Sequence, residues 1–174
     1  KEALALGGVN GKTLAEIKLE LGDVLLFQNK IWEASLLFSQ IELDFKDDVL
    51  GHEAKFRNAK ISFYTGDFEW AQGQLDVLKA STSKLISNNA MQLSLLITDN
   101  FNMDTIPLPM MQYARAELRA YQNQFVLAFQ TLDSIATAFP GHSLTDEILF
   151  TKANIYRKQG DFEKAVLLYT ELVN

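Results

Sequence analysis

The chain has 174 residues, which is room for one ordinary domain or a short array of repeats. Its 22 acidic side chains outnumber its 16 basic ones, so the formal net charge is −6. This acidity argues against nucleic acid as a partner, because phosphate binding needs a surplus of Lys and Arg. The sequence contains no cysteine, which excludes disulfides, thiolate metal sites and a cysteine nucleophile. Its apolar runs fall far short of the roughly 20 residues that cross a bilayer.

Apolar periodicity and turn signals predict helices along the whole chain. In chain order they are expected at 13–28, 31–45, 50–65, 68–80, 108–122, 125–138, 144–159 and 162–173. Ser81–Pro107 is an insertion between the fourth and fifth of these helices. Apolar residues from 85 to 97 predict one more helix there, ending near Asn100, and a loop is expected over Asp99–Pro109. We interpret the insertion as a kink in the array, with a contact for a partner as the alternative.

The first twelve residues carry no clear helical period of their own. Residues 1–6 are consistent with the tail of a preceding helix, and the glycines at 7, 8 and 11 predict a flexible loop. The chain starts at Lys1 and stops at Asn174 directly after an apolar helical pattern, so we expect it to be a segment of a longer protein.

An internal repeat organises the predicted helices. The run Gly-Asp-Phe-Glu-x-Ala at 66–71 recurs at 160–165, and two weaker copies begin at Asn29 and Asn123. The four alanines that share one position of the repeat are 37, 57 and 37 residues apart, namely Ala34, Ala71, Ala128 and Ala165. The chain therefore holds two pairs of units, with the insertion between the pairs.

Each copy of the repeat predicts a tight turn between two helices. Gly or Asn at its first position can take the left-handed backbone conformation that ends a helix. Asp67 and Asp161 follow in two copies and can cap the next helix. The small alanine lets the facing helix approach closely, and a bulky residue four positions later lies on the same face, namely Phe38, Leu75, Leu132 or Tyr169. At the starts of first helices, 13–16 and 143–146 predict capping boxes.

These features resemble the tetratricopeptide repeat (TPR) family, whose units have about 34 residues. The residues that match its pattern are Leu21, Gly22, Ala34, Phe38, Ala59, Gly66, Phe68, Ala71, Ala116, Ala128, Pro140, Ala153, Tyr156, Gly160, Phe162, Ala165 and Tyr169. The period of 37 is longer than that of the family, and no Trp stands at its early aromatic position. The resemblance implies an all-α, TPR-like α-solenoid of antiparallel helical hairpins with one inserted helix, as a single repeat domain over 1–174. The alternative is an unrelated array of helical hairpins.

Motifs for catalysis or metal binding are weak. The glycine-rich run at 7–13 has three residues between its first Gly and the Gly-Lys pair, where a phosphate-binding loop needs four. His52 and His142 are expected in loops, and neither is followed by a second His at the spacing of a zinc helix. The polar residues at 99–104 lack the Gly and terminal Glu of a calcium loop. We therefore expect no catalytic residues, no metal and no cofactor.

By resemblance to TPR proteins, the first helix of each unit lines a concave groove that binds an extended peptide or a helix. Helical phase then gives the candidate partner-binding residues as Asp23, Phe27, Lys60, Phe63, Tyr64, Tyr113, Glu117, Tyr121, Asn154, Arg157 and Lys158. The last three resemble part of the clamp with which some TPR proteins hold a terminal carboxylate. Phe56 and Phe150 stand where a lysine of that clamp would be expected.

The expected function is a non-catalytic scaffold for protein–protein interaction, with a protein or peptide partner, no nucleic acid and no membrane span. The alternatives are a regulatory or carrier module of a larger enzyme or regulator, a structural spacer, and an enzyme that uses the groove as its active site. Apolar surface at the two ends can also drive self-association. The chain looks most like TPR proteins of Bacteroidetes-type bacteria, and its fourth unit resembles repeats of bacterial envelope proteins. The resemblance leans toward the cell envelope or periplasm, with the cytoplasm as the alternative.

Overall fold

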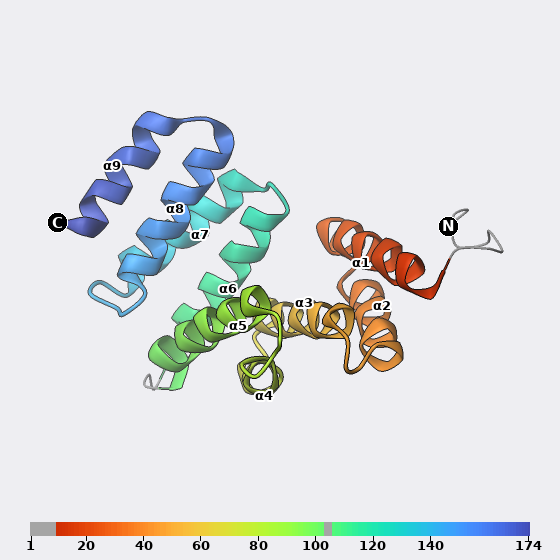
Figure 1. Cartoon of the computed structure of the whole chain (residues 1–174). Coiled ribbons are helices and arrows are strands. Elements are labelled where there is room, and N and C mark those ends of the chain that lie inside the picture. Colours follow the sequence, from red (N-terminus) through yellow and green to blue (C-terminus); the bar gives the residue numbers. More distant parts are fainter. Residues whose placement is uncertain (1–9, 103–105) are drawn as a thin grey trace. The chain divides into compact units, whose positions relative to one another are not determined.

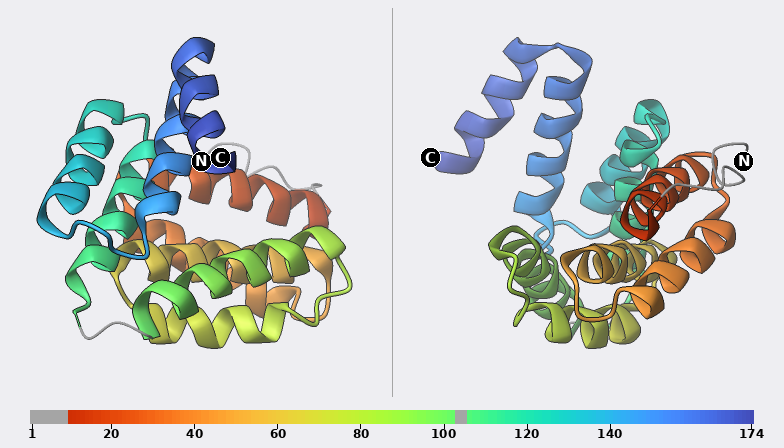
Figure 2. Two further views of the ribbon diagram at one scale, coloured as in Figure 1. Left: turned by 90° about the vertical axis from the view of Figure 1, so that its left-hand side faces the viewer. Right: turned by 45° about the vertical axis from the view of Figure 1, so that its right-hand side comes forward.

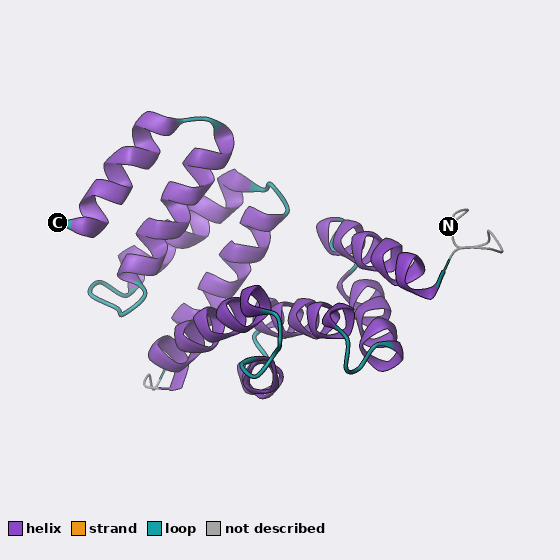
Figure 3. Cartoon of the chain, in the orientation of Figure 1, coloured by secondary structure: helices purple, strands orange, loops and turns teal. Residues whose placement is uncertain are grey.

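Helices account for every regular element in residues 10–102 and 106–174, the part of the chain that the computed structural model describes (Figure 3). In chain order they are α1 (Gly11–Phe27), α2 (Ile31–Asp44), α3 (Val49–Thr65), α4 (Phe68–Leu78), α5 (Lys84–Ile97), a π-helical turn (Thr98–Asn102), α6 (Leu108–Tyr121), α7 (Phe125–Ala138), α8 (Thr145–Gln159) and α9 (Phe162–Val173) (Figure 1). The expected all-α class is confirmed. None of the helices in the described ranges is long and apolar enough to cross a membrane.

Contacts divide the chain into two compact units, which we describe separately. Unit 1 holds the described residues up to Phe63 together with Asp67–Leu95. Unit 2 holds Tyr64–Gly66 and Leu96–Asn174. The helices α1, α2 and α4 therefore belong to unit 1, and α6 to α9 belong to unit 2.

The turns that join paired helices have the predicted backbone conformation. Asn29 and Asn123 have φ angles of 63° and 60°, and Gly66 and Gly160 have φ angles of 85° and 81°. Left-handed backbone is easiest for glycine and is tolerated by asparagine, which explains this choice of residues. The predicted caps are also confirmed, because Asp67 accepts a hydrogen bond from the backbone N–H of Trp70, and Asp161 accepts one from that of Lys164, both at 3.3 Å.

Small residues of the repeat lie at the contacts between paired helices. Within unit 1, α1 packs on α2, and within unit 2, α6 packs on α7 and α8 packs on α9. The pair α8–α9 is an antiparallel hairpin in both views of Figure 2. In unit 2, α8 also contacts α6 and α7, so consecutive hairpins pack on each other. The repeat alanines are buried in every copy, and three of the four bulky residues that follow are fully buried: Phe38, Leu75 and Leu132.

The starts of two first helices differ from the predictions. The capping box at 13–16 is wrong, because α1 begins at Gly11 and Asn10 caps it by accepting a hydrogen bond from the Thr13 N–H at 3.0 Å. The glycine at 11 is therefore helical, while residues 1–9 lie outside the described part. The looser capping box at 143–146 is also wrong, since α8 follows Leu144, whose side chain makes no cap hydrogen bond.

The insertion is more helical than expected. The predicted helix is confirmed as α5, and α6 begins at Leu108, where the helix predicted over 108–122 begins. The loop predicted over 99–109 is wrong at its start, because the chain continues from α5 into the π-helical turn, and at its last two residues, which belong to α6. Its centre, 103–105, lies outside the described residues. Pro109 belongs to the first turn of α6, where the missing N–H of proline leaves no helical hydrogen bond unmade. Side-chain contacts hold α5 to α4, including the Ser87 hydroxyl, which donates to the Lys79 carbonyl at 2.7 Å.

Candidate functional site

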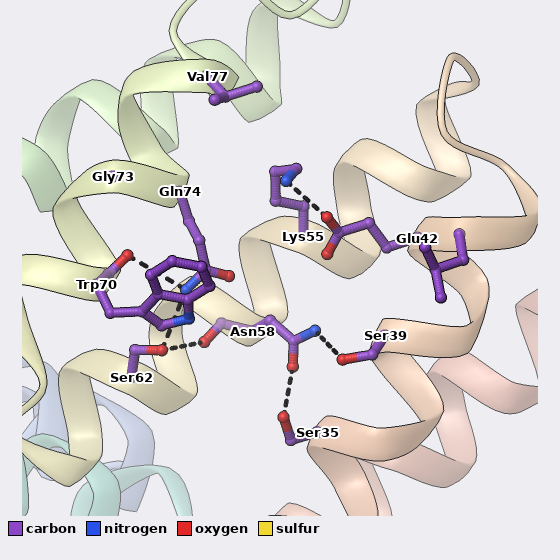
Figure 4. A pocket seen from close by; sticks show the side chains of 11 residues that line it. Ser35, Ser39, Glu42, Lys55, Asn58, Ser62, Trp70, Gly73, Gln74 and Val77 are labelled. Carbon is purple, nitrogen blue, oxygen red and sulfur yellow. Dashed lines mark hydrogen bonds and ion pairs between the residues drawn. The ribbon is translucent and has the colours of Figure 1, made fainter.

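An open pocket of about 500 Å³ lies in unit 1 between α2, α3 and α4 (Figure 4). Clefts of this size are typical of binding sites in proteins. The residues that line it are Ser35, Ser39, Glu42, Leu43, Lys55, Asn58, Ser62, Trp70, Gly73, Gln74 and Val77. Because it combines polar and apolar side chains from three helices of one unit, we treat this pocket as the candidate site.

Polar side chains from all three helices form the floor of this pocket. The Ser35 hydroxyl donates to Asn58 Oδ1 at 3.0 Å, and Asn58 Nδ2 donates to the Ser39 hydroxyl at 3.1 Å. Further along α3, the Ser62 hydroxyl donates to the Asn58 carbonyl and accepts from Gln74 Nε2, both at 3.1 Å. We call Ser35, Ser39, Asn58, Ser62 and Gln74 the polar row. Because its members bond to one another, their side chains are held in place before any ligand arrives.

An ion pair lies beside the polar row. Lys55 Nζ is 2.6 Å from Glu42 Oε1, and each side chain retains about a quarter of its exposed surface. The two charges therefore offset each other at the edge of the pocket, where they remain accessible to solvent and to a bound molecule. Figure 4 shows this pair on the opposite side of Asn58 from Trp70.

Apolar side chains form the rim. Trp70 on α4 is 63% exposed, and its ring stands in front of the polar row in Figure 4. Val77 and Leu43 are also exposed. Gly73 lies between Trp70 and Val77 on α4, and a Cβ atom added to it would meet no atom within 4 Å. The pocket therefore combines a polar floor with an apolar edge that the fold leaves open.

The candidate partner-binding residues in and near unit 1 do not all lie on an open surface, as a groove would require. Asp23 accepts two hydrogen bonds from Arg57 Nε, both at 3.1 Å, in an ion pair between α1 and α3. Phe27 is exposed and Lys60 is half-buried. Phe63 and Tyr64 are 1% and 6% exposed, and the ring of Phe63 packs against Phe68 at a centroid distance of 5.8 Å. An open groove would leave these two rings accessible, but both lie in the core.

In unit 2, two candidates form a buried cluster between α6 and α8. Tyr113 is only 4% exposed, and its hydroxyl lies 2.8 Å from Thr151 Oγ1. The Thr151 hydroxyl in turn donates to Glu117 Oε1 at 2.9 Å. Burial raises the pKa of the Tyr113 phenol well above its usual value, and the nearby Glu117 carboxylate acts in the same direction. Tyr113 thus has an internal role, and it does not offer its ring to a partner.

The remaining candidates of unit 2 lie nearer its surface. Tyr121 is half-buried, while Arg157 and Lys158 are exposed. Asn154 Oδ1 accepts a hydrogen bond from the Tyr169 hydroxyl at 2.8 Å. Lys158 Nζ lies 5.5 Å from the centre of the Phe125 ring, which is the geometry of a cation–π contact. The structure therefore brings Asn154, Arg157 and Lys158 close together on α8, with Arg157 Nη2 donating to Asn154 Oδ1 at 3.4 Å.

Tyr113→Phe is expected to lower the free energy of unfolding by about 1–2 kcal/mol at pH 8, because it removes a buried hydroxyl from its hydrogen bonds. Since folding raises the pKa of this phenol, the stabilisation is complete below about pH 10 and is lost as the pH rises above that value. Urea denaturation should therefore give a smaller difference in the free energy of unfolding between the parent and Tyr113→Phe at pH 11 than at pH 8. A difference of the same size at both pH values would contradict the raised pKa of Tyr113.

The pocket is the feature that analysis of the sequence missed. Its apolar rim comes from second helices, where TPR resemblance directs attention to the first ones. The sequence does contain a signal for the pocket, because α4 carries Trp70 and Val77 on a different face from its buried Ala71 and Leu75. Apolar residues on two faces of one helix indicate that the second face also contacts something.

Both histidines have local roles. His52 lies inside α3, not in the expected loop, and its Nδ1 is 2.9 Å from the Ser81 hydroxyl. The Nδ1 atom of His142 accepts the Leu144 N–H at 3.1 Å. Among the residues that the structure describes, no three His, Asp or Glu side chains lie together as a metal site would require. No protein-family model matches the chain, and no curated protein matches it either.

Proposed function

We propose that this chain is a non-catalytic, TPR-like scaffold that binds a segment of a partner protein, and that unit 1 holds the segment in the pocket between α2, α3 and α4. The observation that carries the proposal is the pocket itself, with its fixed polar floor and its exposed Trp70. Four helical turns, each with a left-handed Gly or Asn at the same position of the repeat and a buried alanine after it, support the TPR-like arrangement. In such arrays, stacked hairpins present extended surfaces to protein partners.

The chemistry of the pocket favours binding over catalysis. A serine becomes a nucleophile when a neighbouring base takes its proton. Here the hydroxyls of Ser35 and Ser39 bond to the side-chain amide of Asn58, which is not a base. The carboxylate of Glu42 is paired with Lys55. The lining side chains therefore supply hydrogen bonds and contact area, which are what a binding site requires.

A tryptophan that is exposed at the rim of a pocket, as Trp70 is, favours a contact surface. Trp side chains supply a large area at a small cost in conformational entropy, and they are enriched among the residues that dominate binding energy. The first helix of the last hairpin, α8 in unit 2, offers a second candidate surface, because Arg157 and Lys158 are exposed on it. The terminal-carboxylate clamp suggested by Asn154, Arg157 and Lys158 belongs to that second surface.

The chain offers a matched pair of variants for testing the proposal. Its two tryptophans are both exposed, Trp70 at 63% beside the pocket and Trp32 at 81% on α2 outside its lining. In pull-downs from a lysate of the source organism, Trp70→Ala should reduce capture of the partner by about tenfold or more. Trp32→Ala should capture the partner as well as the parent does.

Far-UV circular dichroism should show that both variants keep the helix content of the parent. If both capture the same proteins as the parent, the pocket is not the binding site. Double substitution of Arg157 and Lys158 by Glu then tests the second candidate surface on α8. If the chain is a spacer or a carrier module without a partner at either surface, none of these substitutions should change which proteins it captures.

A further inference from the structure

We infer that the pocket of unit 1 takes an extended peptide segment of about three residues, whose backbone bonds to the polar row and whose apolar side chain packs against Trp70. This inference rests on the proposed function and adds the conformation and chemistry of the partner segment. Three observations carry it: the hydrogen-bonding groups of the floor, the length of the pocket along α3, and the glycine in its wall.

The first observation is the kind of groups on the floor. An extended segment presents one backbone N–H and one C=O at each residue that are not bonded within the segment. Amide and hydroxyl side chains such as Asn58 and Ser39 can donate and accept hydrogen bonds, so they suit both backbone groups. The bonds to Ser35 and Ser39 use one of the two donors of the Asn58 amide nitrogen. The pocket therefore offers donors and acceptors whose positions are already fixed.

The second observation is the length of the pocket along α3. Its lining includes Lys55, beside the polar row, and Asn58 and Ser62 within the row, and their spacing of three and four residues places them on one face of α3. At about 1.5 Å per residue, Lys55 and Ser62 are roughly 10 Å apart along the helix. An extended chain covers the same distance in about three residues, at about 3.3 Å each. The pocket therefore matches a short extended segment in length.

The third observation is Gly73. Glycine in the interior of a helix is less stable than alanine, so its presence needs a reason. Gly22 has one, because a Cβ there would lie 2.3 Å from Phe38. Gly51 has one too, because a Cβ there would lie 2.0 Å from the Phe45 carbonyl oxygen. Gly73 is exposed and has no such neighbour, so its missing side chain leaves an open gap beside Trp70 that a side chain of a bound segment can fill.

A helical partner fits the floor less well. A helix satisfies its own backbone groups and would lay a side-chain face across the row. The amide and hydroxyl groups already bond to one another, but apolar side chains laid over them would leave their remaining hydrogen-bonding capacity unused. The polar floor thus favours the extended segment over an amphipathic helix.

The test uses a library of random 12-residue peptides displayed on phage as the probe. The bait is the full chain with Trp32→Phe, in which Trp70 is the single tryptophan. Peptides that also bind Gly73→Phe are discarded, because the phenyl ring fills the gap in the wall. That variant is expected to fold, since nothing lies within 4 Å of the added Cβ. For the best remaining peptide, the affinity is measured by titration of Trp70 fluorescence.

We expect this peptide to shift Trp70 emission to shorter wavelength, because its apolar side chain excludes water from the indole ring. N-methylation of one or more backbone nitrogens within a central stretch of about three residues should weaken binding about tenfold. N-methylation at the peptide ends is the matched control and should have little effect. Substitution of the apolar side chain by Ala should abolish the emission shift.

Three results would overturn the inference. One is a peptide that binds at Trp70 as a helix by NMR and tolerates N-methylation throughout, which would leave the proposed scaffold intact. Another is a library that yields no peptide sensitive to Gly73→Phe. The third is a peptide that binds without changing Trp70 emission. The pull-down with Trp70→Ala separately decides whether a partner protein uses the pocket at all, so failure of the two proposals can be told apart.

Discussion

Gly51→Ala is expected to lower the free energy of unfolding by about 3 kcal/mol, at the upper end of what overpacking costs. The added Cβ would lie 2.0 Å from the carbonyl oxygen of Phe45 and 2.7 Å from its carbonyl carbon. Both are backbone atoms at the end of α2, so relief requires a shift of the connection between α2 and α3. Gly22→Ala meets the ring of Phe38 instead, a side chain that can rotate slightly, and should cost about 2 kcal/mol.

Gly73→Ala is the matched control for this pair of variants. The same chemical change at an open position of α4 should raise the free energy of unfolding by up to about 1 kcal/mol, because alanine favours the helix. Urea denaturation followed by far-UV circular dichroism measures all three. Equal stabilities for Gly51→Ala and Gly73→Ala would show that the connection between α2 and α3 is not as tight as described.

The second large effect is expected at the alanine of the repeat. Ala128 is fully buried on α7, where that helix packs against α6 and α8. Ala128→Leu adds three carbon atoms at this contact and should lower the free energy of unfolding by about 1–3 kcal/mol. Small residues at such contacts set how closely two helices approach, so the added atoms force them apart or force neighbouring side chains out of their preferred rotamers.

Ala138→Leu on the same helix provides the control, because Ala138 is exposed. Leucine and alanine are both good helix formers, so this change should alter stability by less than about 0.5 kcal/mol. Urea midpoints of the two variants measure the difference. If Ala138→Leu were as destabilising as Ala128→Leu, the effect would come from the leucine itself and not from the helix contact.

Much of the helical framework could be predicted from the sequence because its signals are local. The four left-handed turns depend on Gly or Asn at one position, and each adopts the predicted conformation. The bounds predicted for α7 and α9 agree with the structure residue for residue. The starts of helices are harder to predict. Both Asn10 and Thr13 can cap a helix, and the structure uses Asn10.

Much less of the candidate site could be predicted, because burial depends on contacts that are distant in sequence. From the sequence alone, Tyr113 is predicted to contact a partner, but in the structure its hydroxyl lies against Thr151, which is 38 positions later. Asp23 likewise accepts a hydrogen bond from Arg57, which is 34 positions away. Helical phase gives the direction of a side chain from its own helix but does not identify what covers it. Trp70 and the polar row come together only when α2, α3 and α4 are packed, so the pocket could not be predicted from any one helix.

The pairing of consecutive helices has a consequence for how the chain reaches this structure. Contacts between α1 and α2, α6 and α7, and α8 and α9 join segments separated by turns of a few residues. Closing such short connections loses little chain entropy, and proteins dominated by local contacts cross low kinetic barriers. Helical chains of this kind fold in microseconds to milliseconds. We therefore expect the hairpins of this protein to form early, each around its own turn.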